Sequence, residues 1–169
     1  CGVGLIASTE GKKSRKVVEY GINALKAVWH RGAVDADGKT GDGAGIHLEI
    51  PSDFFAEKIE LTGHDHDGSE ICVGMIFLPR NNYQAQENAR TLVESELTKS
   101  NFSIYGWRQV PVNPKVLGEK ANLTRPEITQ VLFKHNNKDL TEKELERKIY
   151  ESRRKIEKET IKHAIEGFY

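Results

Sequence analysis

The chain has 169 residues, of which 37% are hydrophobic, so it is long and apolar enough to bury the core of one ordinary domain. Its 25 lysine and arginine residues balance 25 aspartate and glutamate residues, which leaves no overall basic field to attract nucleic acid or an anionic membrane. Two cysteines are too few for a disulfide framework, and the sequence shows neither a bilayer-length apolar run nor a signal-peptide pattern. We therefore expect a soluble, cytoplasmic protein with no nucleic-acid or membrane partner.

The first residue, Cys1, carries a thiol and a free α-amine, and the apolar run from Gly2 to Ala7 follows it directly. This run predicts a strand that holds the end of the chain in place. Thiols titrate near ~8.5 and α-amines near ~7.7–8.0, so at neutral pH the amine can favour the thiolate or take its proton. Cys1 is therefore a candidate nucleophile with its own general base.

Two other interpretations of Cys1 remain open at this point. The numbering can simply start at this residue, with no chemical meaning. Alternatively, the sulfur is the acylated cysteine of a bacterial lipoprotein, although such an anchor needs a flexible polar tether and a strand directly after Cys1 argues against one.

The next predicted element is a helix over about 14–30, which is ended by Gly32 and follows a turn over 8–13. A loop over 30–45 then contains five glycines and three aspartates and leads into a predicted strand over 46–50. Glycines at this density let the backbone approach a ligand or turn with positive φ. The loop lacks the Gly-Lys-Ser/Thr of a phosphate-binding P-loop and the terminal glutamate of a calcium loop.

The rest of the chain alternates predicted helices and strands, with no linker that divides two domains. These elements are a short helix over 51–59, a strand over 71–79, an amphipathic helix over 82–100, strands over 102–110 and 125–133, and a charged helix over 141–159 with a stripe of Leu145, Ile149 and Ile156. We expect the strand over 71–79 to be buried on both faces, with Cys72 packed as a small hydrophobic residue. Residues 164–169 resemble the entrance to a further strand.

Two polar stretches suggest other functions. The stretch from His64 to Gly68 alternates imidazoles with carboxylates, as some metal sites do, but we interpret it as a solvated turn and predict no metal site. The basic run from Arg153 to Lys155 is neutralised by neighbouring glutamates, so we interpret it as a solvated helix face.

Three ordered blocks in the first forty-five residues resemble one known family. They are Cys1-Gly2-Val3-Gly4, then AVWHRGA over 27–33, then Asp35-Ala36-Asp37 with TGDGAG over 40–45. They closely resemble the start of the large subunit of bacterial glutamate synthases, which is a class II glutamine amidotransferase domain. The resemblance implies that residues 1–169 are part of an N-terminal-nucleophile hydrolase, an α+β fold with an αββα sandwich that is incomplete in this chain.

In that family the N-terminal cysteine attacks the side-chain amide of glutamine, its amine moves the proton, ammonia leaves, and water releases glutamate. By position, the resemblance implies that Cys1 is nucleophile and base and that Arg31 and Gly32 bind substrate or support the site. Thr40 and Asp42 are then loop-shaping residues. A second role for Arg31 stays open, that of a buried arginine which braces the loop through backbone carbonyls.

The family also has an Asn-Gly pair for the oxyanion and an arginine and an aspartate that hold glutamine, and none of these has a matching position here. Losing an oxyanion donor costs about 10²–10³ in rate, so we expect little or no glutaminase activity from this chain alone. The alternatives are another class II amidotransferase and a non-catalytic binding or scaffold domain of the same fold.

For the full-length protein, the resemblance implies transfer of ammonia to 2-oxoglutarate in a synthase domain. That domain would hold FMN and a 3Fe-4S cluster, with NADPH or ferredoxin as the electron source and a small reductant-binding subunit as a partner. No cofactor motif for these groups is present in residues 1–169.

Overall fold

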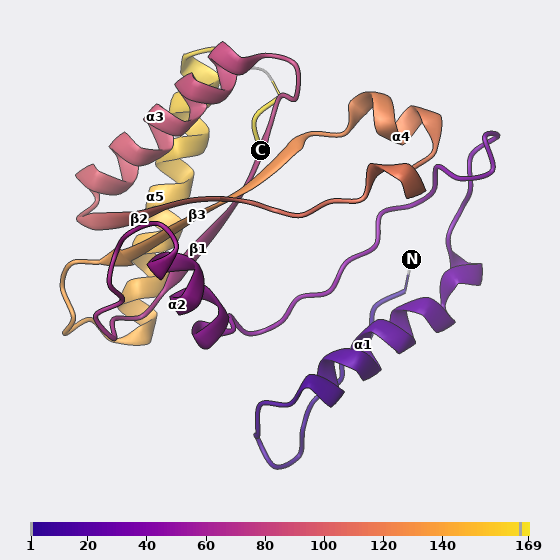
Figure 1. Ribbon diagram of the computed structural model, residues 1–169, viewed down its shortest axis with the longest axis horizontal. Helices are drawn as coiled ribbons and strands as arrows, with labels where there is room; N and C mark the ends of the chain where they lie inside the picture. Colours follow the sequence, from indigo (N-terminus) through magenta and orange to yellow (C-terminus); the bar gives the residue numbers. More distant parts are fainter. Residues whose placement is uncertain (1, 166) are drawn as a thin grey trace. The chain divides into compact units, whose positions relative to one another are not determined.

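The protein is described by a computed structural model that covers residues 2–165 and 167–169 (Figure 1). The chain forms two compact units. Unit 1 comprises Cys1–Glu49 with Val112–Thr124, and unit 2 comprises Ile50–Pro111 with Arg125–Tyr169. We describe each unit by itself.

Unit 2 is built on an antiparallel three-stranded sheet with the order β1-β3-β2. The strands are β1 (Cys72–Leu78), β2 (Phe102–Gln109) and β3 (Glu127–His135), and they appear as arrows in Figure 1. Strand β3 pairs antiparallel with both neighbours, so β1 and β2 run parallel to each other with β3 between them. The β1–α3–β2 connection is therefore a split β–α–β motif. This architecture is α+β, as predicted.

Helices cover both faces of this sheet. On one face lie α3 (Tyr83–Lys99) and α5 (Glu142–Lys162), and on the other lies α2 (Ser52–Glu60). Neighbouring residues of β3 show the division, because Val131 packs in the cluster with α3 and α5 whereas Leu132 packs with α2. Successive side chains of a strand point to opposite faces, so one central strand contributes to two cores.

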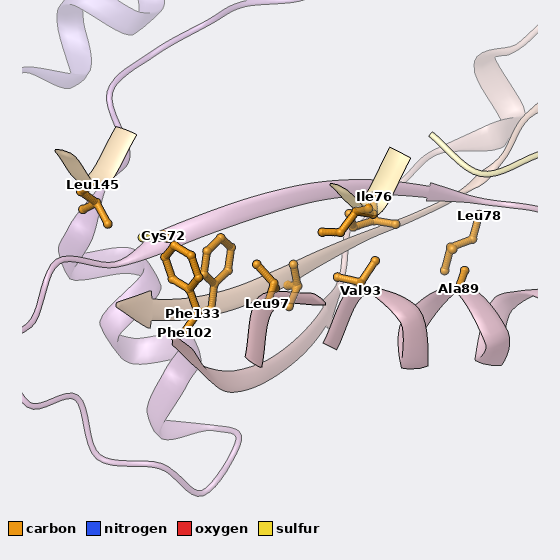
Figure 2. Close-up of a cluster of buried hydrophobic side chains, with 11 residues drawn as sticks. Cys72, Ile76, Leu78, Ala89, Val93, Leu97, Phe102, Phe133 and Leu145 are labelled. Carbon is orange, nitrogen blue, oxygen red and sulfur yellow. The ribbon is translucent and has the colours of Figure 1, made fainter. Parts of the chain in front are cut away.

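The larger core lies between the sheet and the helix pair α3 and α5 (Figure 2). Its buried members are Cys72, Ile76, Leu78, Ala89, Val93, Leu97, Phe102, Val131, Phe133, Leu145 and Ile156. The predicted apolar stripe of the last helix is confirmed, with Ile149 partly buried against the same cluster. Burial raises the pKa of the Cys72 thiol to about 12, so Cys72 is a protonated, packed residue as predicted.

One prediction for this sheet is wrong. Strand β1 is not buried on both faces, since the Met75 side chain in its middle is 47% exposed. Helix α2 packs against the sheet through its own residues Phe55 and Ile59. This contact does not extend over Met75, so the middle of β1 stays uncovered on the α2 side. No strand is assigned to the described residues of 164–169, but Tyr169 exchanges two backbone hydrogen bonds with Phe77 of β1, the pattern of an antiparallel pair, which supports the predicted entrance to a further strand at this residue alone.

The helices of unit 2 begin at capping residues that the sequence contains. The Asn82 side chain accepts a hydrogen bond from the Ala85 amide at the start of α3, and Thr141 forms a capping box with Glu144 at the start of α5. In α5, Arg153 and Arg154 both pair with Glu157, so the basic run lies on a charge-balanced helix face as predicted.

Unit 1 is mainly loops and short helices. It contains α1 (Arg15–Ala27), the 3₁₀ turn η1 (Trp29–Arg31), the 3₁₀ turn η2 (Pro114–Val116) and α4 (Glu119–Thr124). The predicted helix is thus confirmed, although its last turn is 3₁₀, while η2 and α4 were not predicted. No side chain of α1 is fully buried, and the apolar residues of its stripe, which include Val17, Ile22 and Leu25, are only partly buried.

The strands predicted over 2–7 and 46–50 are absent from the described residues. Their apolar side chains are exposed: Val3, Leu5 and Ile6 in the first segment, and Ile46, Leu48 and Ile50 in the second. A strand is stabilised by hydrogen bonds to a neighbouring strand, and neither segment has such a partner in the described chain. In the same residues no helix is both long and apolar enough to cross a bilayer.

The core of unit 2 predicts the stability effect of truncating Leu78, which is fully buried. Changing Leu78 to Ala removes three carbons from a packed cluster and leaves a cavity, so the free energy of unfolding should fall by about 2–5 kcal/mol. Urea unfolding followed by circular dichroism measures this. The matched control is Leu61→Ala, at a side chain 76% exposed, which should change stability by less than about 0.5 kcal/mol. Equal losses for the two variants would contradict the assigned core.

Candidate active site

The predicted nucleophile, Cys1, lies outside the described residues, so the site is built from its surroundings. A β-carbon placed on Gly2 would lie 3.8 Å from Cγ2 of Val28. The segment that follows Cys1 therefore runs against the C-terminal end of α1. Trp29, His30 and Arg31 follow Val28 directly, so the first two family-like blocks of the sequence meet at this point.

The turn η1 sets the path of the chain after α1. The Arg31 amide donates to the Val28 carbonyl at 2.9 Å, and the Gly32 amide donates to the Trp29 carbonyl at 3.1 Å. Gly32 itself is extended, with φ −88° and ψ 152°, so its role does not rest on positive φ. The Arg31 side chain is exposed, which does not fit a buried arginine that braces the loop.

Asp42 closes the base of the glycine-rich loop. Its Oδ2 accepts a hydrogen bond from the Ala33 amide at 3.0 Å, and its own amide donates to the Ala33 carbonyl at 3.3 Å. One residue further in, Val34 and Gly41 form an isolated antiparallel bridge. These contacts join the two arms of the loop directly after Gly32.

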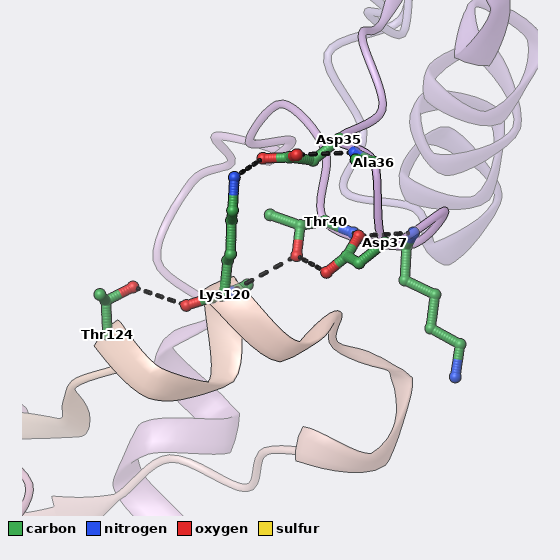
Figure 3. A network of polar contacts seen from close by, with 8 residues as sticks. Asp35, Ala36, Asp37, Thr40, Lys120 and Thr124 are labelled. Carbon is green, nitrogen blue, oxygen red and sulfur yellow. Dashed lines mark hydrogen bonds and ion pairs between the residues drawn. The ribbon is translucent and has the colours of Figure 1, made fainter.

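Asp37 and Thr40 hold the tip of the loop (Figure 3). The Thr40 hydroxyl donates to Oδ2 of Asp37 at 2.6 Å, and the amides of Lys39 and Thr40 donate to Oδ1 at 2.9 and 2.7 Å. These three donors, the Thr40 hydroxyl foremost, hold the pKa of Asp37 well below its usual range. Asp37 is therefore an anion whose oxygens are occupied by the loop itself.

Helix α4 contacts the same loop tip from a distant part of the sequence. The Lys120 ammonium lies 2.8 Å from Oδ2 of Asp35, and the Ala121 amide donates to the Thr40 hydroxyl at 3.4 Å. Figure 3 shows Lys120 reaching Asp35 beside the Thr40 contact. Gly118 is buried next to these groups, and a β-carbon there would overlap Thr40 and Asp37.

Sequence reasoning missed three of these residues: Asp37, Gly118 and Lys120. The Asp37-to-Thr40 spacing is a local signal, because aspartate often caps the amides two and three residues later. For Gly118 and Lys120 no local signal exists, since their contacts join positions about eighty residues apart.

The polar stretch over 64–68 lies in unit 2, away in sequence from the loop just described. Asp67 accepts from the ammonium groups of Lys134 at 2.7 Å and Lys138 at 3.0 Å. Lys134, followed by Ser69 and Lys138, holds the pKa of Asp67 well below its usual range. The His66 ring nitrogen Nε2 lies 2.9 Å from the Ser69 carbonyl. The Asp67 carboxylate is therefore paired with two lysines from outside the turn, and the His66 ring contacts the backbone of the turn itself.

A comparison with known protein families assigns the chain. The family model described as glutamine amidotransferases class-II matches residues 1–169. The chain belongs to the class-II glutamine amidotransferases. The family resemblance carried by the three N-terminal blocks is thereby confirmed.

Curated relatives of this amidotransferase chain are glutamate synthases. It is 53% identical over 169 residues to the glutamate synthase [NADPH] large chain of Azospirillum brasilense, covering 100% of this chain and 11% of that protein. It is 40% identical over 163 residues to ferredoxin-dependent glutamate synthase 1, chloroplastic/mitochondrial, of Arabidopsis thaliana, covering 94% and 10%. A third relative is ferredoxin-dependent glutamate synthase 2 of Synechocystis, 41% identical over 133 residues, covering 78% and 8%. The amidotransferase chain thus spans about a tenth of the length of these relatives.

The residues of this amidotransferase chain do not fit an iron–sulfur cluster. Such clusters are held by several cysteine thiolates, and the sequence has only Cys1 and Cys72. Cys72 is buried, and burial raises the pKa of its thiol to about 12.

Replacing Gly118 tests the contact between α4 and the loop. Gly118→Ala introduces a methyl group that overlaps Thr40 and Asp37, so the free energy of unfolding of unit 1 should fall by about 1–3 kcal/mol. The amide resonances of Lys39 and Thr40 should shift at the same time. The control is Gly43→Ala, whose β-carbon meets nothing within 4 Å. Unchanged Lys39 and Thr40 resonances in Gly118→Ala would show that α4 does not hold the loop.

The Asp37 contacts also predict a pH dependence. A carboxylate whose pKa is lowered by folding stabilises the loop fully above its unfolded pKa, near ~3.9, and this contribution is lost as pH falls toward the folded value. In a titration by NMR, the Lys39 and Thr40 amides should therefore keep their positions as pH falls from 7 to about 4 and shift only below that. Asp37→Asn should remove the acid shift. A midpoint for wild type near ~4 would contradict the assigned hydrogen bonds.

Proposed function

We propose that this chain carries the nucleophile of a glutaminase site and that Cys1 opens the side-chain amide of glutamine. The observation that carries the proposal is the class-II amidotransferase match, which begins at a cysteine whose α-amine is free if no residue precedes it. Adjacent thiol and amine groups have pKa values that overlap near neutral pH, and this supports one residue acting as nucleophile and base.

The proposed reaction conserves atoms and charge in two steps. The Cys1 amine takes the thiol proton, the sulfur attacks the side-chain carbonyl carbon, and the carbon–nitrogen bond breaks. The leaving nitrogen takes the proton from the amine and departs as ammonia, which leaves a glutamyl thioester. Water then attacks the thioester, glutamate leaves, and the thiol regains a proton.

The loop residues have supporting roles in this proposal. Arg31 is an exposed cation three residues beyond Val28, the side chain that Gly2 approaches, and we assign it to orienting the substrate carboxylate. Gly32 continues the chain away from η1 in extended conformation. Thr40 and Asp42 shape the loop through the contacts at its tip and base.

We further propose that residues 1–169 are part of an αββα N-terminal-nucleophile domain. The exposed apolar residues over 2–7 and 46–50, together with the only partly buried apolar stripe of α1, support this, because they are typical of strands and helices that pack in a larger sandwich. In that domain the two segments would pair as strands. An oxyanion hole and the residues that clamp glutamine would lie outside residues 1–169.

For the whole protein, the relatives support a glutamate synthase. The ammonia would then pass to 2-oxoglutarate in a cytoplasmic enzyme whose synthase domain holds FMN and a 3Fe-4S cluster and works with a small reductant-binding subunit. The names of the relatives give NADPH or ferredoxin as the reductant, and the 53% identity to an NADPH-named chain favours NADPH.

Labelling with 6-diazo-5-oxonorleucine, an electrophilic analogue of glutamine, tests the proposed nucleophile. We expect one adduct in the whole natural protein, located by peptide mass spectrometry at Cys1, and none in Cys1→Ala. Cys72 is the internal control, because its buried, protonated thiol should stay unlabelled. A folded protein that is labelled at Cys72 alone, or not at all, would contradict the proposal and favour a non-catalytic domain of the same fold.

The role of the missing oxyanion donors is tested by comparing the glutaminase rate of residues 1–169 with that of the whole protein. The isolated polypeptide of residues 1–169 should release ammonia from glutamine at least about 10²-fold more slowly than the whole protein. Comparable rates would contradict the assignment of oxyanion and clamp residues to positions outside residues 1–169.

A further inference from the structure

A second candidate site lies wholly within unit 2. A pocket of about 540 Å³ opens beside the start of α3, where the loop after β1 meets the ends of β2 and β3. Arg80 contributes from the loop, Arg90 from α3, and Arg125 from just before β3. Trp107 of β2 and Thr129 of β3 form part of its wall. The catalytic proposal above uses none of these residues.

The charge of the pocket favours an anion. Besides the three arginines just named, Arg108 lines it, and Glu127 is the carboxylate in its wall. We leave Arg108 out of the count of guanidinium groups that face the pocket. Its guanidinium donates to Gln130 at 2.7 Å and lies 5.2 Å from the centre of the Phe54 ring on the α2 side. When Glu87, which pairs with Arg90, is counted beside Glu127, three guanidinium groups against two carboxylates still leave an excess of positive charge.

Arg90 is held in a fixed position at this pocket. Its guanidinium lies 5.9 Å from the centre of the Trp107 ring and forms an ion pair with Glu87. The ring is fixed in turn, because Nε1 of Trp107 donates to Glu94 at 2.6 Å. A stacked arginine loses less side-chain freedom when it binds an anion, so it binds more tightly than a mobile one.

The backbone near the pocket also favours negative charge. Helix α3 has 17 residues, Asn82 caps it, and its first turn contains no acidic residue. The positive end of its dipole therefore lies close to the pocket without a carboxylate to neutralise it. Buried Gln86 of the first turn donates to the Pro79 carbonyl at 2.9 Å, which holds the loop that carries Arg80.

An independent observation comes from Thr129. This pocket residue is only 4% exposed, and its hydroxyl has no hydrogen-bond partner within the described part of the protein. Leaving a buried hydroxyl unpaired costs about 1–3 kcal/mol, so such a group usually has a partner in the working protein. A ligand oxygen in the adjacent pocket would supply one.

We propose that this pocket binds a small organic or inorganic anion with more than one phosphate or carboxylate group. Several acidic groups match several guanidinium groups, and the volume exceeds what a single phosphate fills. The site is separate from the Cys1 chemistry, so it stands or falls independently of the proposed glutaminase function.

Isothermal titration calorimetry of the whole natural protein tests the site. Pyrophosphate and citrate are the probes, and sodium chloride holds the ionic strength constant. We expect saturable binding of at least one probe, and the better probe shows whether phosphate or carboxylate is preferred. Arg90→Gln should weaken binding at least about tenfold, and Thr129→Val about threefold to tenfold.

Three controls separate a built site from general charge and from misfolding. Arg147→Gln removes one exposed cation of α5, which is paired with Glu151, and should change affinity less than about twofold. Arg90→Lys keeps the charge and should retain part of the binding. Cys1→Ala should bind as wild type does. The proposal is overturned by the absence of saturable binding, by equal weakening in Arg147→Gln and Arg90→Gln, or by loss of binding in Cys1→Ala.

Discussion

The structure of unit 2 depends on β3, the strand whose two edges are both paired. Its backbone forms hydrogen bonds with β1 along one edge and with β2 along the other. Its side chains alternate between the two faces of the sheet and pack in two different cores. Val131 and Leu132, neighbours in sequence, are 1% and 0% exposed on opposite faces. Burial on both faces means that helices pack on both sides of this strand, with α3 and α5 on one face and α2 on the other. The pocket beside α3 is a product of the same arrangement, because β2 ends and β3 begins where this helix starts.

Unit 1 is stabilised by different forces. Among its described residues no hydrophobic side chain is buried, and its loop is held by hydrogen bonds to the carboxylates of Asp37 and Asp42 and by the ion pair between Lys120 and Asp35. Such contacts fix local geometry without requiring a core. The class-II amidotransferase family assignment is consistent with this division.

Much of unit 2 was predictable from the sequence, because periodicity and capping are local signals. The helix from Tyr83 to Lys99 follows a repeated apolar pattern and an asparagine cap, and the stripe on α5 faces the core as its spacing requires. The partial exposure of β1 was not predictable, since it depends on how far α2 extends over the sheet. The strands expected over 2–7 and 46–50 failed for a similar reason: an apolar run specifies a strand only when a partner strand is available. The motif blocks identified the family correctly, whereas Gly118 and Lys120 depend on contacts between distant positions.

The functional account rests on one chemical claim, that the thiol and the α-amine of Cys1 act together on an amide. Trapping the intermediate tests it most directly. The whole natural protein is mixed with glutamine, quenched with acid after a fraction of one turnover, and digested for mass spectrometry. The account predicts a glutamyl group on the Cys1 sulfur that hydroxylamine removes, and no such adduct once the amine has been acetylated. An adduct on another residue, or undiminished turnover with the amine blocked, would contradict it.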